Sequence, residues 1–169
     1  VNGRRWAQPV KSYLYENPQG GLTRVEYIDG WVYHEDYDSK FGLLEEKSVG
    51  IKGELPIWGG FFAGEDYNYL IYGQNNEEED DKKEVIRIVQ YDKDWNRLKQ
   101  ASLFGGNTVE PFEAGSLRCD EYNGYLYIRT CHKMYTSDDG LNHQANVMLV
   151  VRQKDMKITD SFYLVEWGV

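Results

Sequence analysis

The chain has 169 residues, of which 41% are hydrophobic and 28% charged, a composition typical of a folded protein with one or two domains. Its net charge of −9 and its scattered basic residues argue against a nucleic-acid partner, because binding to phosphates requires clustered Lys and Arg. No apolar stretch approaches the ~20 residues of a membrane-spanning helix. The high aromatic content, 15%, favours β-strands.

Three segments along the chain predict β-hairpins of one pattern, at residues 33–49, 88–103 and 150–162. Each has a strand, a short polar turn with Asp, an aromatic residue or Met just after the turn, and a second strand. Tyr37-Asp38 recurs 54 residues later as Tyr91-Asp92, and Trp95 recurs 61 residues later as Met156. Such self-similarity is the mark of a repeat architecture.

A second element precedes the last two hairpins, at residues 65–72 and 120–128, and a weaker copy lies at residues 26–33. Two hairpins make four strands, and a repeat of about 55 residues matches one blade of a β-propeller. We therefore expect one all-β repeat domain over residues 1–169, a partial propeller of about three antiparallel four-stranded blades. The approximate units are 1–54, 55–109 and 110–169.

Three blades are too few for closure, because propellers have about four to eight blades and natural proteins avoid open sheet edges. We therefore expect either a homo-oligomer or a fragment of a longer chain that completes the propeller. The start at Val1, without Met or a signal-peptide pattern, also indicates a cut or processed piece.

The two cysteines are expected to be free thiols. Asn123-Gly124 predicts a two-residue hairpin turn, which places Tyr122 opposite Tyr125. In this register Cys119 faces Ile128, so that Cys119 and Cys131 point to opposite faces of the sheet. A disulfide requires Cα atoms within about 7 Å of each other.

Five segments between residues 55 and 163 can be compared with known proteins, namely 55–64 (LPIWGGFFAG), 89–98 (VQYDKDWNRL), 112–118 (FEAGSLR), 127–135 (YIRTCHKMY) and 139–146 (DGLNHQAN). Through these segments the chain resembles a group of large, uncharacterised secreted or surface-attached proteins of Gram-positive bacteria with propeller-like repeats. The resemblance implies an extracellular or cell-surface location but no activity.

Residues 136–143 are similar to the Asp box of sialidases and related propellers, a Ser/Thr-x-Asp-x-Gly-x-x-Trp hairpin. The segment reads TSDDGLNH, so that His143 stands in place of Trp. In those proteins the box is a structural turn away from the active site. The likeness therefore bears on the fold and not on catalysis.

The sharpest candidate site is the pair Arg118 and Arg129, which the hairpin register places opposite each other. Two cross-strand arginines repel, so they need an anion or a carboxylate between them. One interpretation is a binding site for a sugar acid or another carboxylate. The alternative is a structural salt-bridge cluster with Glu113 or Asp120.

The sequence offers further candidate residues: two histidines, an Asp pair and a tryptophan. His132 and His143 could be metal ligands or an acid–base pair, although isolated histidines near turns more often form structural hydrogen bonds. Asp138-Asp139 lacks the alternating oxygen ligands of a dedicated calcium loop, and we predict neither a metal nor a cofactor. Trp58 could stack on a sugar ring or pack between blades.

Glu110 and Glu113 flank Pro111-Phe112 in a predicted linker that leads into the innermost strand of a unit. Propellers place ligand sites at the mouth of the central channel, and such linkers reach it. The ligand-binding candidates are therefore Arg118, Arg129, His132, Glu113 and Trp58, and no catalytic residue is assigned. The sequence favours a binding or scaffold module for a glycan or protein, and the alternative is a glycan-cleaving hydrolase or lyase of propeller type.

Overall fold

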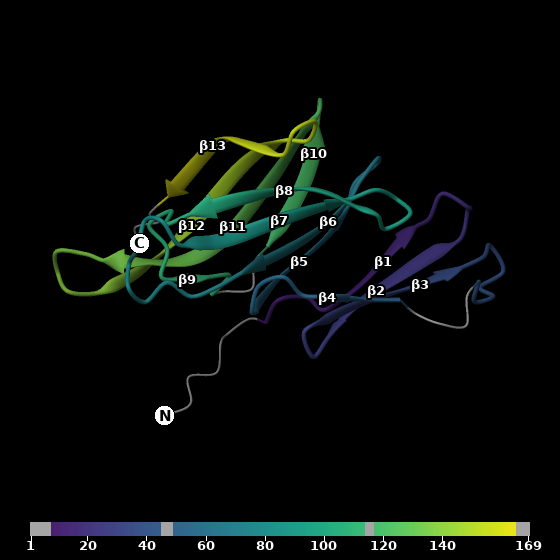
Figure 1. Ribbon diagram of the computed structural model, residues 1–169, viewed down its shortest axis with the longest axis horizontal. Helices are drawn as coiled ribbons and strands as arrows, with labels where there is room; N and C mark the ends of the chain where they lie inside the picture. Colours follow the sequence, from purple (N-terminus) through teal and green to yellow (C-terminus); the bar gives the residue numbers. More distant parts are fainter. Residues whose placement is uncertain (1–7, 45–48, 114–116, 165–169) are drawn as a thin grey trace, which may run out of the picture.

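The computed structural model describes residues 8–44, 49–113 and 117–164, which form three antiparallel sheets (Figure 1). Sheet A contains β1 (Ser12–Glu16), β2 (Leu22–Ile28), β3 (Trp31–Tyr37) and β4 (Val49–Lys52). Sheet B contains β5 (Ile57–Ala63), β6 (Asn68–Gly73), β7 (Glu84–Tyr91) and β8 (Arg97–Phe104). Sheet C contains β10 (Arg118–Tyr122), β11 (Tyr125–Thr136), β12 (Asn142–Arg152) and β13 (Lys157–Leu164), and the short β9 (Glu110–Pro111) pairs with β11.

The prediction of an all-β chain with repeated four-stranded antiparallel sheets is confirmed. The predicted linker at residues 110–113 is partly wrong, because Glu110 and Pro111 form β9. Both β9 and β10 pair with β11, at different points along it, so the first strand of sheet C is interrupted rather than preceded by a linker.

The repeated Asp marks a recurring five-residue turn. In the β7–β8 turn, the Asp92 carboxylate accepts hydrogen bonds from the backbone N–H groups of Asp94 and Asn96. Asp38 binds the N–H groups of Lys40 and Gly42 in the same way after β3. Asp favours such turns because its short carboxylate reaches backbone donors two residues on.

The aromatic residue or Met in each turn has the same backbone conformation. Phe41, Trp95 and Met156 have φ of 64°, 64° and 53°, in the left-handed region. Non-glycine residues seldom adopt this region, so the shared φ marks equivalent turn positions in three sheets. The sequence repeat is therefore a repeat of turn geometry.

Two hairpins have two-residue turns with positive φ at both positions, Asp29-Gly30 and Asn123-Gly124. This is the geometry that suits the twist of antiparallel strands. In the second hairpin Tyr122 pairs with Tyr125 and Arg118 with Arg129, which confirms the predicted register.

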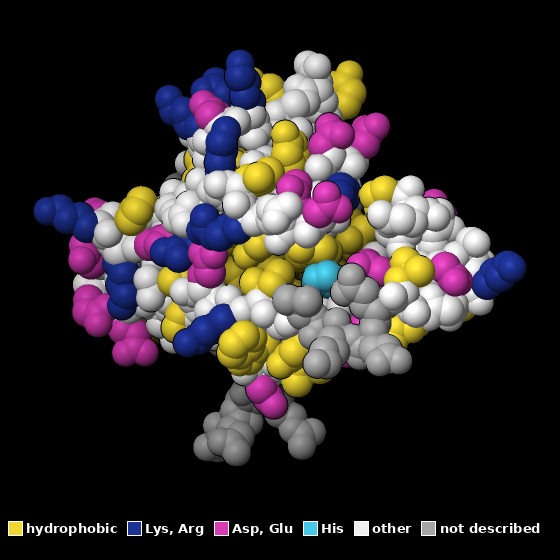
Figure 2. All heavy atoms as spheres, turned by 45° about the vertical axis from the view of Figure 1, so that its right-hand side comes forward, with side chains coloured by type: hydrophobic (Ala, Val, Ile, Leu, Met, Phe, Trp, Pro, Cys, Tyr) yellow, Lys and Arg dark blue, Asp and Glu magenta, His cyan; other side chains and the backbone are white. Residues whose placement is uncertain are grey.

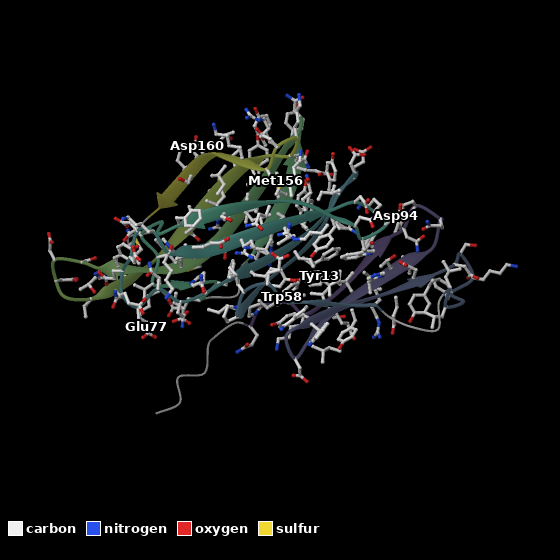
Figure 3. All side chains as sticks on the ribbon, in the orientation of Figure 1. Tyr13, Trp58, Glu77, Asp94, Met156 and Asp160 are labelled. Atoms are coloured by element: carbon white, nitrogen blue, oxygen red, sulfur yellow. The ribbon has the colours of Figure 1, made fainter. Side chains whose placement is uncertain are left out.

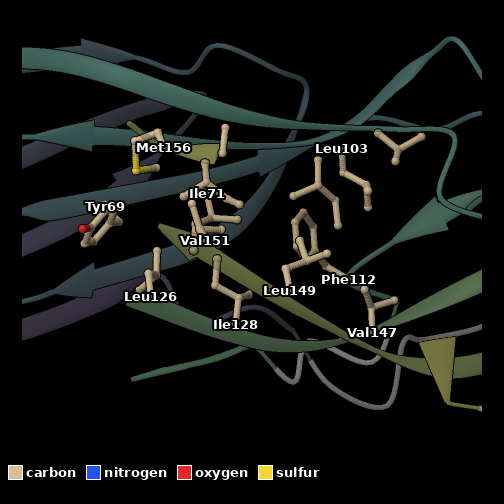
Figure 4. Packing of buried hydrophobic residues seen from close by; sticks show 14 residues of the cluster. Tyr69, Ile71, Leu103, Phe112, Leu126, Ile128, Val147, Leu149, Val151 and Met156 are labelled. Carbon is tan, nitrogen blue, oxygen red and sulfur yellow. The ribbon is translucent and has the colours of Figure 1, made fainter. Parts of the chain in front are cut away.

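Sheet B lies between the other two sheets, and its side chains alternate between two cores. Leu70, Tyr72 and Val89 pack with Val25 and Val32 of sheet A. The alternate residues of sheet B pack against sheet C, and Figure 4 shows this second core. It contains Tyr69, Ile71, Ile86 and Ile88 of sheet B and Leu126, Ile128, Val147, Leu149 and Val151 of sheet C.

The two cores explain the apolar runs. All six residues of β6 are buried, because both faces of sheet B are covered. The runs in β11 and β12 alternate between buried and partly buried residues, because sheet C is covered on one face only in the described structure. Their nearly continuous apolar runs alone would predict central strands buried on both faces, which the partly buried outer residues contradict.

Candidate functional site

A cleft with a volume of about 450 Å³ lies between sheet A and the β7–β8 turn of sheet B. Figure 3 shows Asp94, in that turn, next to sheet A, and Figure 2 shows hydrophobic side chains in a hollow between protruding polar parts of the chain. The cleft is lined by carboxylate, amide, hydroxyl, imidazole, ammonium and aromatic side chains, namely Tyr15, Asn17, Gln19, Thr23, His34, Asp36, Lys93, Asp94 and Trp95.

Sheet A contributes a histidine and a carboxylate from one face of β3. His34 and Asp36 are two residues apart on this strand, so both point towards sheet B. The distance between His34 Nδ1 and Asp36 Oδ2 is 3.6 Å, and the hydroxyl of Thr23 donates to Asp36 Oδ1. The Asp36 side chain keeps 33% exposure, so its carboxylate remains accessible from the cleft.

Sheet B contributes an ammonium group. Lys93 Nζ donates to Asn68 Oδ1 at 3.0 Å and lies 5.2 Å from the centre of the Tyr15 ring. Asn68 is fully buried, and its amide also donates to the Tyr15 hydroxyl at 3.2 Å. Burial lowers the pKa of Lys93 and raises the pKa of Tyr15. The ammonium is therefore held at the junction of the two sheets.

Trp95 joins the two sides of the cleft. Its ring is stacked on the ring of His34, with centroids 4.6 Å apart and planes at 9°, and Phe61 is stacked 5.8 Å away. Its indole N–H is buried without a hydrogen-bond partner. Such a donor is costly unless something accepts from it.

The cleft thus brings together a carboxylate acceptor, an ammonium donor and amide groups within an aromatic wall. This mixture suits a small hydroxyl-rich molecule, which needs donors and acceptors at fixed positions. No group of three or more His, Cys, Asp or Glu side chains in the described ranges could hold a metal ion.

The structure places the predicted arginine pair on the face of sheet C that points away from sheet B. Arg118 and Arg129 are cross-strand neighbours, and both are exposed. Arg118 also lines a separate cavity of about 210 Å³ with Tyr13 of β1 and Phe61 of β5. The first strands of all three sheets therefore contribute to one cavity, since Arg118 belongs to β10.

His132 is not part of the arginine site. It is three residues from Arg129 on β11, so it points to the opposite face, where it is fully buried between sheets B and C. Its Nδ1 lies 2.6 Å from the hydroxyl oxygen of Thr108. Burial lowers the pKa of His132 to about 4.

Glu113 and Trp58 each have partly or fully buried surroundings, unlike the exposed arginines. Glu113 lies in the interruption between β9 and β10 and has a buried carboxylate oxygen without a hydrogen-bond partner. Trp58 is 4% exposed, its ring is stacked 4.6 Å from that of Tyr27, and its N–H donates to Val10 O at 2.8 Å. Figure 3 shows Trp58 between sheets A and B, which favours the packing interpretation over sugar stacking.

The Asp-box-like segment forms the turn between β11 and β12. Asp139 Oδ1 accepts from the N–H of Leu141, and His143 Nε2 lies 2.7 Å from Asp139 Oδ2. These interactions are local to the hairpin. Cys119 and Cys131 are free thiols as predicted, and burial raises the pKa of Cys119 to about 12.

The main cleft was not predicted. His34, Asp36 and Lys93 lie in two of the repeated hairpins, where they read as ordinary strand and turn residues. One signal was present, because Val32, His34 and Asp36 alternate along a strand whose Val is buried. That alternation places a histidine and a carboxylate on an inward face, where polar residues need partners.

Comparisons with known proteins found no match among family models, curated proteins or solved structures. Within the described ranges, no helix is long and apolar enough to cross a membrane.

Proposed function

We propose that this chain is a glycan-binding module of an extracellular or surface-attached bacterial protein, and that its ligand binds in the cleft between sheets A and B. The cleft carries the proposal, because Asp36 and Lys93 provide an acceptor and a donor from opposite sides of one cavity. The extracellular bacterial setting comes from the sequence resemblance of residues 55–163.

We further propose that the three sheets are consecutive blades of a β-propeller. The shared cavity of Tyr13, Phe61 and Arg118 supports this proposal, because the first strands of propeller blades surround the central axis. The glycan site would then lie between two blades and not at the axis.

Lys93→Met is expected to weaken glycan binding at least tenfold, because it removes the ammonium donor and retains much of the aliphatic side chain. The parent would first be screened on an array of neutral and uronic-acid-containing oligosaccharides. The strongest binder would then be titrated calorimetrically against both proteins, with circular dichroism to verify folding. A tenfold loss corresponds to about 1.4 kcal/mol of binding free energy.

The matched control is Lys40→Met, since Lys40 is an exposed lysine of the β3–β4 turn and does not line the cleft. Arg118→Ala separates the cleft from the arginine pair. A parent that binds no oligosaccharide, or a loss of binding with Arg118→Ala but not with Lys93→Met, would contradict the proposal.

A second candidate function is glycan cleavage, and the proximity of His34 and Asp36 favours it. A histidine beside a carboxylate can act as a general base when the carboxylate holds the imidazole in place. Release of reducing ends from the bound oligosaccharide, and its loss in His34→Asn, would establish this activity. Binding without release would assign the cleft to recognition alone.

A further inference from the structure

The two end sheets each have one face that no described sheet covers. We call these the outer face of sheet A and the outer face of sheet C, and both point away from sheet B. Sheet B, in contrast, is covered on both sides, by sheet A on one and by sheet C on the other. To identify equivalent faces in the three sheets, we use the second strand of each sheet, β2, β6 and β11. The hydrogen bonds of this strand show which of its residues point to each face.

Residues of an antiparallel strand bond alternately to the previous and the next strand, and the two sets point to opposite faces. In sheet B, Gln74 N bonds to Val85 O, so Tyr72 and Leu70 belong to the set that bonds to the third strand. Both residues face sheet A. The face of this set therefore points to the preceding sheet.

Sheet C follows the same rule. The N–H of Gln153 bonds to Gly124 O, which places Leu126 and Ile128 of β11 in the set that bonds to β12, the third full strand of this sheet. Both residues pack in the core between sheets B and C. The junction of sheets B and C thus uses the same type of face as the junction of sheets A and B.

In sheet A this type of face is the uncovered one. The N–H of Tyr27 bonds to Lys11 O, so Tyr27 and Val25 bond to the first strand, and they face sheet B. Arg24 and Glu26 belong to the other set and lie on the outer face. The outer face of sheet A is therefore equivalent to the face of sheet B that packs on sheet A. The outer face of sheet C is equivalent to the face of sheet A that packs on sheet B.

We infer that the outer face of sheet C in one copy of the chain packs on the outer face of sheet A in a second copy. The two faces are the two halves of the junction that already occurs twice within the chain. Two copies joined in this way at both ends would contain six sheets, within the range of about four to eight blades of closed propellers. A closed dimer of this kind leaves no end sheet uncovered.

The apolar residues of the outer faces fit such a junction. On sheet A, Leu14 is 67% and Trp31 40% exposed, and a hollow of about 360 Å³ lies among Leu14, Leu22, Arg24, Tyr37 and Phe41. On sheet C, Met148 and Val150 are partly buried and Phe162 is 46% exposed. Exposed apolar side chains on a sheet face commonly mark an interaction surface.

The charges of the two faces are of opposite sign. Cross-strand register places Arg118, Arg129, Lys133, Arg152 and Lys157 on the outer face of sheet C with Glu110, Asp120 and Asp160, which gives a net charge of +2. It places Glu16, Glu26 and Glu35 on the outer face of sheet A with Arg24 and Lys52, which gives −1. The opposite charges favour contact between a sheet A face and a sheet C face. The like charges of two sheet C faces oppose contact between them.

The test is the mass in solution of the parent and of two variants, Leu14→Asp on sheet A and Phe162→Asp on sheet C. By sedimentation velocity the parent is expected at twice the 19.8 kDa of one chain, and each variant alone at the mass of one chain. Each variant keeps one intact outer face, so a mixture of the two is expected to form a one-to-one complex. Both substituted residues are substantially exposed, so folding should be retained.

Leu98→Asp is the control, because Leu98 is 44% exposed but lies on sheet B, and this variant is expected to remain a dimer. A parent with the mass of one chain at 100 µM would overturn the inference. So would a Leu14→Asp variant that still forms dimers, because it would show that like faces pair with each other. The measurement requires no glycan, so its outcome is independent of the proposed binding site.

Discussion

Phe112→Ala is expected to lower the free energy of unfolding by about 3–5 kcal/mol, the usual cost of removing a fully buried aromatic ring. Phe112 is 1% exposed and has a φ of 57°, which turns the chain out of β9 and directs the ring into sheet B. The ring fills a slot beside two glycines. A Cβ atom added to Gly59 would lie 2.6 Å from Phe112 Cζ, and one added to Gly73 would lie 2.8 Å from Phe112 Cε2.

Urea denaturation of a double-mutant cycle with Gly59→Ala would verify this packing. Gly59→Ala alone is expected to destabilise the fold, because the three nearest atoms to the added methyl group all belong to Phe112. In the Phe112→Ala background the clash is absent, so Gly59→Ala is expected to cost less stability there than in the parent. Residues in contact typically show a coupling of about 0.5–3 kcal/mol, and we expect a coupling within this range.

Phe104→Ala is the matched control, since Phe104 is 55% exposed on β8, and its effect is expected within about 0.5 kcal/mol. If Phe112→Ala costs no more than this control, or if the losses at positions 59 and 112 simply add, the ring does not act as the contact between β9 and sheet B.

Features that depend on neighbouring residues were predictable from the sequence. Asn123-Gly124 fixed the register of β10 and β11, because a two-residue turn with positive φ permits one pairing. In two of the three turns the Asp carboxylate binds the turn backbone and the residue three positions later has a positive φ, as at Asp38 and Asp92. Met156 has the same positive φ without an Asp three positions earlier. Local turn chemistry was therefore sufficient to divide the chain into similar units.

Features that depend on how sheets stack were not predictable. Lys93 and Asp36 are 57 residues apart and meet only because the β7–β8 turn of sheet B lies over the inner face of sheet A. Strand alternation, in contrast, was sufficient to separate His132 from Arg129, because residues three apart on β11 point to opposite faces. The predicted site nevertheless combined residues from opposite faces of one strand.

The tautomer of His132 follows from its neighbour. The hydroxyl of Thr108 donates its single hydrogen to Gly106 O at 2.8 Å, so its oxygen is left to accept a hydrogen bond from the Nδ1–H of His132. His132 is fully buried between sheets B and C, and burial lowers its pKa to about 4 from an ordinary value of 6.5. The folded protein therefore holds the neutral imidazole.

Acidification is consequently expected to destabilise the fold through this residue. Between pH 6.5 and about 4 the unfolded chain binds a proton at His132 and the folded chain does not. The contribution of His132 to the free energy of unfolding is therefore fully present above pH 6.5 and is lost as the pH falls. Below about pH 4 both states are protonated and the loss stops growing. The difference in pKa corresponds to a total loss of about 3 kcal/mol.

His132→Asn separates this effect from the other titrating groups, because asparagine retains an N–H donor for Thr108 and does not titrate. Urea denaturation at several pH values from 7 to 5 is expected to show a smaller loss of stability in the variant than in the parent. Over this range the carboxylates contribute little, since they titrate mainly below pH 5. His143→Gln is the matched control for the loss of a histidine, because the His143 side chain is exposed and lies outside the core between sheets B and C. Equal slopes for the parent and His132→Asn would show that the buried imidazole is not the source of acid sensitivity.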